Sequence, residues 1–314
     1  MTCRRCNHIA RKFGRYGKRR IQRYRCITCK LTFSDYEPKL GTHYTSPDVA
    51  AKALAMMLEG MSVRAISRLT GLHKGTILSL MDTAAQRAGA KLDSLVRNVR
   101  VRYVQADEIW TFVSKKDKHV RVDDPEEFGN QWAFIALDAE TKLIVSCVIG
   151  KRTSETTRYF LADLKSRIAD ARFQLTTDGF HFYQRGVEDV FAGQTDFAQL
   201  VKLFGDYGQF DTADARYSPP RITEVISKIR DGRPDPDHIS TSYVERSNLS
   251  LRMHLRRYTR LTNAFSKKLD NLKAAVTLYV AFYNFCRTHQ TLRVTPAMEA
   301  GLTDHVWSLA ELFS

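Results

Sequence analysis

The sequence predicts a multidomain chain of three parts: a small cysteine-rich ribbon, an all-α unit, and a larger α/β domain with a mixed sheet. Three observations predict it. Two Cys-x2-Cys pairs lie within the first 29 residues, helical periodicity runs from about residue 46 to about residue 95, and strand patterns interrupted by helices begin near residue 99. At 314 residues the chain is long enough for several domains. We expect these domains at 1–44, 45–96 and 97–314.

The composition favours a folded protein with a polyanionic partner. Hydrophobic residues make up 43% of the chain, the formal net charge is +15, and the sequence pI is about 9.6. Nucleic acid is the simplest such partner, and a merely basic surface is the alternative. The first 44 residues hold twelve Lys or Arg and two acids, which is +10 of the +15. No apolar run approaches 18 residues and the N-terminus has no signal-peptide core, so we expect no membrane span and a cytoplasmic protein.

Four of the six cysteines follow the pattern Cys3-x2-Cys6-x19-Cys26-x2-Cys29. Two such pairs can close a tetrahedral Zn²⁺ site, with the intervening residues running out and back as a hairpin. So few apolar residues occur here that the metal must supply much of the folding free energy. A pair of disulfides is the alternative, which a reducing cytosol disfavours. His8 could replace a cysteine, although an exposed histidine is the simpler interpretation.

The ribbon is also the most basic part of the chain. We expect Arg19, Arg20 and Arg23, together with the aromatic residues Tyr16, Tyr24 and Phe33, to contact nucleic-acid phosphates. Contacts of this kind supply affinity without sequence choice.

The all-α unit has the pattern of a helix-turn-helix. A first helix starts at Ser46-Pro47 and ends near residue 58, a short second helix covers 63–69, Gly71 lies in the turn, and a third helix begins near residue 74. A further helical stretch continues to about residue 95. The third helix would enter a DNA groove, with His73, Lys74 and Thr76 as the contacting residues. A plain three-helix packing unit is the alternative.

The remaining residues predict a mixed sheet. We expect strands at 99–113, 132–137 and 143–149, a helix after Thr153, and a returning strand at 173–177. A right-handed crossover through the helix would lay this fourth strand beside the first. A short helix at 187–191, a strand at 197–204, a loop at 205–237, and helices at 242–255 and 266–286 follow. Since loops as long as 205–237 are usually functional or disordered, we hypothesise that it contacts DNA or a second subunit.

Three acids of this domain form a candidate metal site. Asp107 lies in the middle of an apolar strand, Asp178 ends the fourth strand, and Glu245 lies on the helix at 242–255. A buried carboxylate needs a compensating partner, and hard oxygen ligands suit Mg²⁺ or Mn²⁺. Alone, Asp178 would be a turn residue and Glu245 a solvated side chain. Glu108 competes with Asp107, but strand alternation sends it to the opposite face, so it is set aside.

A basic run follows the third acid. Arg252, Arg256 and Arg257 would lie beside the candidate site and suit a DNA backbone. A solvated helix end is the alternative. Arg287 and His289, after the last long helix, either support the site or cap that helix.

Four groups of residues together resemble the DDE transposases of the RNase H-like superfamily, most closely the insertion-sequence-one type. They are Asp107-Glu108-Ile109-Trp110, Thr177-Asp178-Gly179, Tyr243-Val244-Glu245-Arg246-Ser247-Asn248, and Tyr283-Asn284-Phe285-Cys286-Arg287-Thr288-His289 with Leu292 and Thr295-Pro296. The likeness covers the whole chain, because that family also has an N-terminal cysteine ribbon and a helix-turn-helix.

The resemblance implies an RNase H-like catalytic domain with Asp107, Asp178 and Glu245 as the catalytic acids. It also implies an oligomer on double-stranded DNA, associated with the nucleoid, that cuts at terminal inverted repeats and joins the ends to target DNA. Two alternatives stay open: a DNA-binding regulator without chemistry, and a general RNase H-like nuclease or resolvase.

Overall fold

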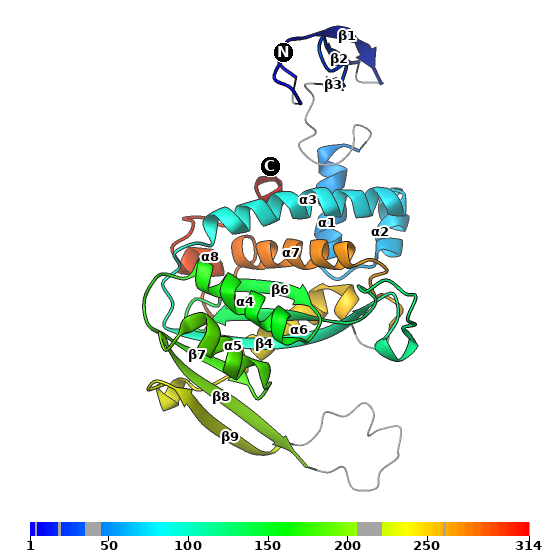
Figure 1. Ribbon diagram of the computed structural model, residues 1–314. Helices are drawn as coiled ribbons and strands as arrows, with labels where there is room; N and C mark the ends of the chain where they lie inside the picture. The colour runs from blue at the N-terminus through cyan, green and yellow to red at the C-terminus, as the bar shows by residue number, and fades with distance from the viewer. Residues whose placement is uncertain (4, 18–19, 35–44, 206–221, 260–261, 314) are drawn as a thin grey trace.

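The computed structural model describes residues 1–3, 5–17, 20–34, 45–205, 222–259 and 262–313. It contains a small three-stranded sheet, a group of helices, and a six-stranded mixed sheet with helices on its faces (Figure 1). Arg19, the expected domain boundary at residue 44, and the first part of the expected 205–237 loop lie outside these ranges. No helix in the described ranges is both long and apolar enough to cross a membrane.

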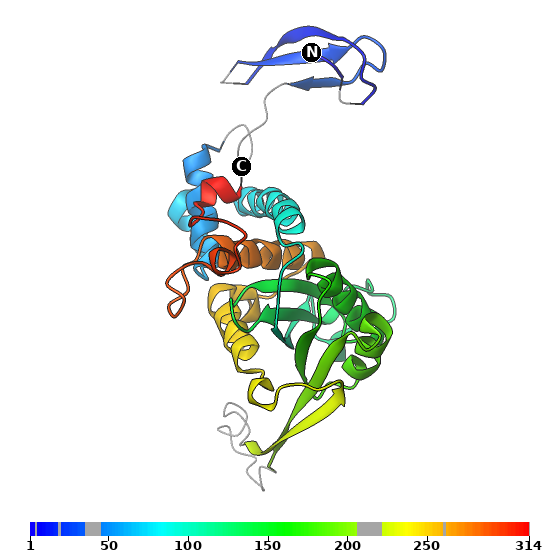
Figure 2. The same cartoon turned by 90° about the vertical axis from the view of Figure 1, so that its left-hand side faces the viewer.

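The N-terminal sheet is an antiparallel ribbon of β1 (Ala10–Tyr16), β2 (Ile21–Cys26) and β3 (Thr32–Ser34). The expected hairpin is therefore present. Gly14 and Gly17 both have positive φ, a conformation that glycine adopts without steric cost. The sheet lies apart from the other elements in two perpendicular views (Figures 1 and 2).

Three helices follow, α1 (Pro47–Leu58), α2 (Val63–Thr70) and α3 (Lys74–Leu95). Ser46 and Ser62 cap α1 and α2, each by accepting a hydrogen bond from a backbone N–H of the first turn. Gly71 ends α2 with a φ of 71°. The expected third helix and the stretch after it are one helix of 22 residues.

The large sheet has the order β6-β5-β4-β7-β8-β9. Its strands are β4 (Tyr103–Val113), β5 (Gly129–Asp138), β6 (Ile144–Gly150), β7 (Phe173–Asp178), β8 (Thr195–Phe204) and β9 (Ile222–Asp231). Strands β4 to β6 form an antiparallel meander, β7 lies parallel to both β4 and β8, and β9 is antiparallel to β8. The expected neighbourhood of the first and fourth strands is thus confirmed.

The described end of the 205–237 segment is not a loop, because β9 occupies 222–231. The sequence did not predict this strand, because nearly all of its side chains are exposed on both faces. A strand with no buried face shows no alternation of apolar and polar residues.

Helices cover both faces of the sheet. One hydrophobic cluster joins the sheet to α4 (Ser154–Arg167) and α5 (Phe182–Phe191). A second cluster, on the other face, joins it to α6 (Ser242–His254), α7 (Leu269–Phe285) and the helices α1 to α3. Shorter helical turns are η1 (Asp117–His119), η3 (Pro236–His238), η4 (Arg256–Tyr258), α8 (Pro296–Glu299) and α9 (Leu309–Leu312).

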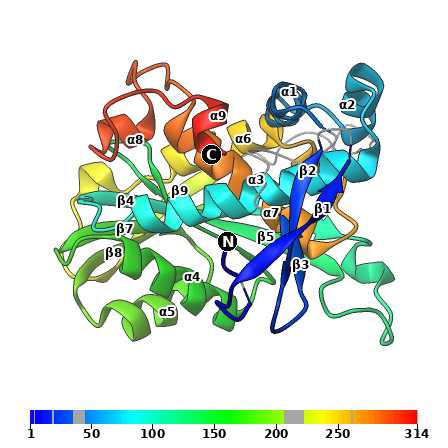
Figure 3. The same cartoon turned by 90° about the horizontal axis from the view of Figure 1, so that it is seen from above.

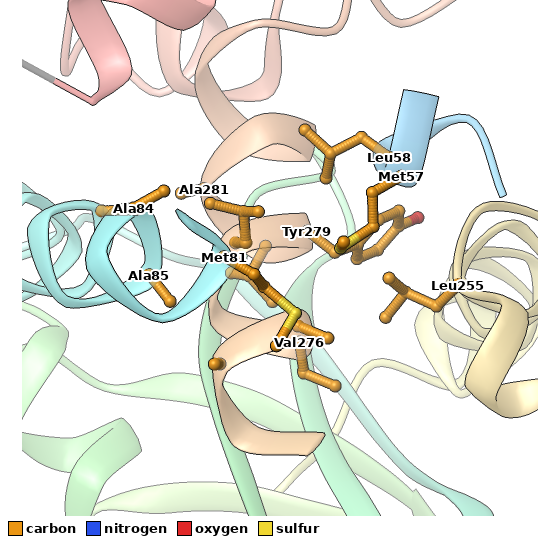
Figure 4. Close-up of a cluster of buried hydrophobic side chains, with 14 of the residues drawn as sticks. Met57, Leu58, Met81, Ala84, Ala85, Leu255, Val276, Tyr279 and Ala281 are labelled. Atoms are coloured by element: carbon orange, nitrogen blue, oxygen red, sulfur yellow. The ribbon is translucent and has the colours of Figure 1, made fainter. Parts of the chain in front are cut away.

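The helical unit shares its core with the rest of the chain. Figure 4 shows Met57 and Leu58 of α1 and Met81 of α3 gathered around Tyr279 of α7. From above, α3 covers much of α7 (Figure 3). The domain boundary at residue 96 stays a prediction, but α1 to α3 are packed on the sheet's helical layer rather than separate from it.

Candidate functional site

The acidic site lies where the pairing of β4 with β7 ends. The last paired residues of these parallel strands are Ala106 and Thr177, so the next residues along both strands, Asp107 and Asp178, leave the ladder side by side. One oxygen each of Asp107, Glu108 and Asp178 lies within 4.8 Å of the others. The expected meeting of Asp107 with Asp178 is present.

Glu108, which strand alternation set aside, lies in this acidic group. Alternation does turn it toward the α4 and α5 face, beside Tyr183. Its carboxylate nevertheless reaches Asp178, because β7 ends there and no longer separates the two faces. The Glu108 side chain is only 2% exposed, whereas that of Asp178 is 37% exposed.

Burial and mutual repulsion keep these acids from ionising easily. Desolvation, followed by the Asp178 charge, raises the pKa of Asp107 to about 6 and that of Glu108 to about 8. Desolvation also raises the pKa of Asp178. Three adjacent carboxylates with raised pKa values form a site that a divalent cation would stabilise.

Arg152, between β6 and α4, lies between two of the acids. Its Nη2 is 2.9 Å from Glu108 Oε2 and 3.7 Å from Asp178 Oδ2. Its guanidinium lies 3.8 Å from the centre of the Phe180 ring, which fixes its plane. Arg152 partly neutralises the site, and a single charge cannot balance three carboxylates.

Helix α6 is fixed against the same strand. Gln105 of β4 accepts hydrogen bonds at Oε1 from the backbone N–H groups of Tyr243 (2.9 Å) and Val244 (3.2 Å). Asn248, one turn further on, donates from Nδ2 to Asp107 Oδ2 at 2.8 Å. Residue 105 and residue 107 share a face, so one face of β4 both anchors α6 and presents the acid.

Glu245 lies on α6 between these anchors but is absent from the acidic group in the described part of the chain. Its Oε1 accepts a hydrogen bond from Thr241 Oγ1 at 2.6 Å and forms an ion pair with Lys202 of β8. It remains near enough for its charge to raise the pKa values of Asp107 and Asp178, after desolvation. The expected three-acid convergence is therefore incomplete, because Lys202 holds the third carboxylate aside.

The donor set fits a divalent ion. Glu108 is buried beside the Tyr183 hydroxyl, and desolvation raises the pKa of Glu108 more than the hydrogen bond from that hydroxyl lowers it. An ionised carboxylate buried in this way is costly, and a divalent cation would offset that cost. Within the residues that the structure describes, Asp107, Glu108 and Asp178 are the acids placed to hold such an ion.

The sequence assigned no role to Arg152 or Lys202, and Asn248 entered only as part of the residues that carry the family resemblance. Of these, only Asn248 had a signal, since it lies three residues after Glu245 and therefore on the same side of a helix. Arg152 and Lys202 come from segments that only the folded sheet brings to the acids.

The four cysteines of the ribbon form a second cluster. Their sulfur atoms all lie within 4.8 Å of one another, with Cys3 to Cys29 at 3.5 Å and Cys6 to Cys26 at 3.4 Å, and none is in a disulfide. The Cys29 N–H donates to Cys26 Sγ, and this contact lowers the pKa of Cys26 to about 6. Four clustered thiols with a thiolate-favouring backbone contact fit Zn²⁺. His8 instead bonds to the Cys6 carbonyl through Nδ1.

The expected DNA-binding residues have different surroundings. His73 caps α3 by accepting a hydrogen bond from the Gly75 N–H (3.1 Å), Lys74 is exposed, and Thr76 is half-buried. Arg20 is exposed, and Arg23 lies over the rings of Phe13 and Tyr16.

The three arginines expected beside the acidic site, in and after α6, also differ in their surroundings. Arg256 is exposed and Arg252 is half-buried. Arg257 donates to Ser266 Oγ at 2.8 Å, and desolvation lowers its pKa to about 10. Arg287 contacts the His254 ring at the end of α6, so it supports the helix that carries Glu245.

A basic groove of about 570 Å³ joins the helical unit to the segment after α6. Its lining residues include five basic side chains and no acidic one. The basic residues are Arg64, Lys74, Arg256, Arg257 and Lys267. Three of the expected DNA contacts, Lys74, Arg256 and Arg257, thus line one groove, although Lys74 lies 182 residues before Arg256 in the sequence.

No family of known proteins matches the chain by sequence, and no curated protein matches it. Among solved structures, the piggyBac transposase synaptic complex with hairpin DNA is 9% identical, with a TM-score of 0.36, and the match covers 90% of this chain and 70% of that one. The Mos1 transposase paired-end complex with the left transposon end is 12% identical, with a TM-score of 0.23, over 52% of this chain and 62% of that one. A Mos1 mariner paired-end complex with Mn is 13% identical, with a TM-score of 0.21, over 51% and 60%. These three structures are of transposases, at identities and scores that assign neither the fold nor the activity to this chain.

Proposed function

We propose that the protein is a DNA transposase of the DDE type that performs metal-dependent phosphoryl transfer. The observation that carries this proposal is the meeting of Asp107, Glu108 and Asp178 at the divergence of two parallel strands, opposite the helix that bears Glu245. An acidic cluster in a chain of net charge +15 suits a polyanionic substrate whose phosphates bind through metal ions.

In this proposal Asp107 and Asp178 hold the ion, and Glu245 completes the site. A bound Mg²⁺ or Mn²⁺ would stabilise charge on the attacking and leaving oxygens of a phosphodiester. Asn248 orients the Asp107 carboxylate through its hydrogen bond, and Arg152 orients Glu108 through its ion pair. Lys202, which now binds Glu245, also places a positive charge where a DNA phosphate would approach.

The other parts of the chain would hold the DNA. We assign DNA binding to the Zn²⁺ ribbon (1–44) and the helix-turn-helix (45–96), and chemistry to an RNase H-like domain (97–314). The groove that contains Lys74 and Arg256 is too small for a duplex, but its five basic side chains suit contact with phosphates at the duplex surface.

The test uses duplexes taken from both flanks of the protein's reading frame, incubated with the full chain and Mn²⁺. We expect cut and joined products from the unmodified chain. Asp107→Asn, Asp178→Asn and Glu245→Gln should abolish both products and retain DNA binding in a mobility-shift assay. Glu126→Gln, an exposed acid outside the site, is the matched control. Full activity in any of the three variants removes that residue from the site.

One observation favours a second function, a DNA-binding regulator without chemistry. Glu245 is held by Lys202 and Thr241 and does not join the other acids. If that arrangement persists with metal and DNA, the chain binds DNA and does not cut it. Mn²⁺-independent binding with no strand scission on any flanking duplex would support this alternative.

A further inference from the structure

The two edge strands of the large sheet, β6 and β9, have different surroundings. At β6, α4 and α7 pack against the strand, and the Asn284 side chain bonds to the backbone of Ile144, accepting from its N–H (3.0 Å) and donating to its C=O (2.9 Å). That side chain occupies the position of a neighbouring strand. At the opposite edge, β9 has no described element beyond it. Exposed edges of this kind pair with other strands unless something prevents it.

The β9 edge is suited to pairing. It is ten residues long, lacks proline, and exposes apolar side chains, with Val225 at 51% and Ile229 at 60% exposure. Its four charged residues are two acids and two bases, Glu224 and Asp231 with Lys228 and Arg230. In a chain of net charge +15 this neutral strand does not suit DNA phosphates, whereas it suits a surface with the same alternation of charges.

We propose that β9 pairs antiparallel with β9 of a second copy of this chain, with the two-fold axis at Ser227. A two-fold axis perpendicular to the sheet keeps each residue on its own face. Only residues of the same face can therefore lie opposite one another. In this register Glu224 lies opposite the partner's Arg230, and Val225 lies opposite the partner's Ile229. Each pair occurs twice.

These pairs satisfy both faces of the strand. Opposite charges and large apolar side chains directly across an antiparallel pair each stabilise it by about 0.2–1 kcal/mol. Arg230 already donates from Nε to Gln199 Oε1 (2.9 Å), so the ion pair uses its outer nitrogens. Moving the axis by one residue, to Ile226, would place Glu224 opposite the partner's Lys228. That register sets Val225 opposite a serine and Ile229 opposite a threonine, so it loses the apolar pairs.

The pairing would make one continuous sheet with both acidic sites on the same face. From Asp178 to the partner's Asp178 there are five strand intervals, or about 24 Å at about 4.8 Å each. Two sites so placed could act on two DNA ends at one target. That last use rests on the proposed function, whereas the pairing of the strands does not.

Cysteine cross-linking tests the register in the full chain. Directly opposite residues in an antiparallel pair have Cα atoms about 4.5–5.5 Å apart, within the range of a disulfide. Ser227→Cys should therefore give a covalent dimer under mild oxidation. Ile226→Cys and the unmodified chain, which has six cysteines of its own, are the controls and should not. Cross-linking through residue 226 alone, or through neither position, overturns the proposal.

Charge exchange tests the contact without oxidation. Glu224→Arg and Arg230→Glu should each weaken dimerisation by at least about tenfold in sedimentation velocity, and the double variant should restore it. Both side chains are exposed, so each variant should keep the circular dichroism spectrum of the unmodified chain, which shows that it is folded. A mass unaffected by either single variant overturns the proposal. Asp107→Asn should leave the dimer intact even if it abolishes DNA cleavage, so the test is independent of the proposed function.

Discussion

The two clusters of candidate metal ligands differ in how the chain assembles them. The cysteine cluster comes from a single segment of 27 residues, in a ribbon whose side chains are mostly exposed. The acidic cluster comes from β4 and β7, 71 residues apart, between two hydrophobic clusters that form without it. The cysteines would therefore stabilise the segment that carries them, whereas the acids lie in a fold whose stability comes from the two hydrophobic clusters. Loss of the first should unfold structure, and loss of the second should remove only binding and chemistry.

The largest expected effect is on the ribbon. Cys26→Ser should abolish binding of one Zn²⁺ per chain and unfold residues 1–34, because structural zinc supplies about 10–16 kcal/mol to such segments. Zinc content by atomic absorption and amide exchange of the ribbon measure this. Cys147→Ser, which changes a thiol outside the cluster, is the control. A ribbon that stays protected after zinc removal would refute the contrast between the two clusters.

The second expected effect is a change of stability with pH, whose sign follows from the pKa values of the acids. The pKa values of Asp107 and Glu108 are raised on folding, from 3.8 and 4.5 to about 6 and about 8. The unfolded state therefore releases these protons first, and the metal-free protein loses stability as pH rises from about 4 to about 8. Bound Mg²⁺ favours the ionised acids, so its stabilising effect should increase over the same range.

Thermal unfolding at pH 5, 7 and 8.5, with and without Mg²⁺, checks this expectation. Glu108→Gln should flatten the metal-free profile and reduce the effect of Mg²⁺, and Glu126→Gln should change neither. If the metal-free chain is instead most stable at pH 8.5, folding does not raise the pKa values of these acids.

The smallest expected effect is on the cation that holds the third acid. Lys202→Ala removes the ion pair to Glu245 and should tighten Mn²⁺ binding about 3- to 10-fold, the effect of about 1 kcal/mol of released competition. Lys202→Arg keeps the charge and should leave the affinity near that of the unmodified chain. Isothermal titration of both variants measures it. Weaker binding in Lys202→Ala would show that Lys202 positions Glu245 for the metal rather than competing with it.

Local patterns predicted much of the architecture. The cysteine spacing, the serine caps of α1 and α2, and the turn glycine at 71 depend on neighbours in sequence, and all lie in the structure as expected. The crossover rule also placed β7 beside β4, because handedness limits where a returning strand can go.

What the sequence hid depends on contacts between distant elements. Glu108 obeys alternation, and its reach to Asp178 follows only from where β7 ends. The position of Glu245 depends on its ion pair with Lys202, which lies 43 residues earlier in the sequence, on β8. The strand β9 is invisible to periodicity because it has no buried face.

The turn between α1 and α2 is in contact with the end of α6. Gly60 has a φ of 82°, and a Cβ at that position would lie 2.6 Å from the Met253 carbonyl oxygen. His254 also bonds through Nδ1 to the Leu58 carbonyl at 2.8 Å. Helix α6, which bears Glu245, is therefore in direct contact with the helical unit that would bind DNA. The two cannot shift relative to each other without breaking these contacts. Under the proposed function, this contact would fix the number of base pairs between the sequence that the helical unit binds and the phosphate that the acids cut. An end lengthened by one base pair, about 3.4 Å, would present the wrong phosphate to the acids.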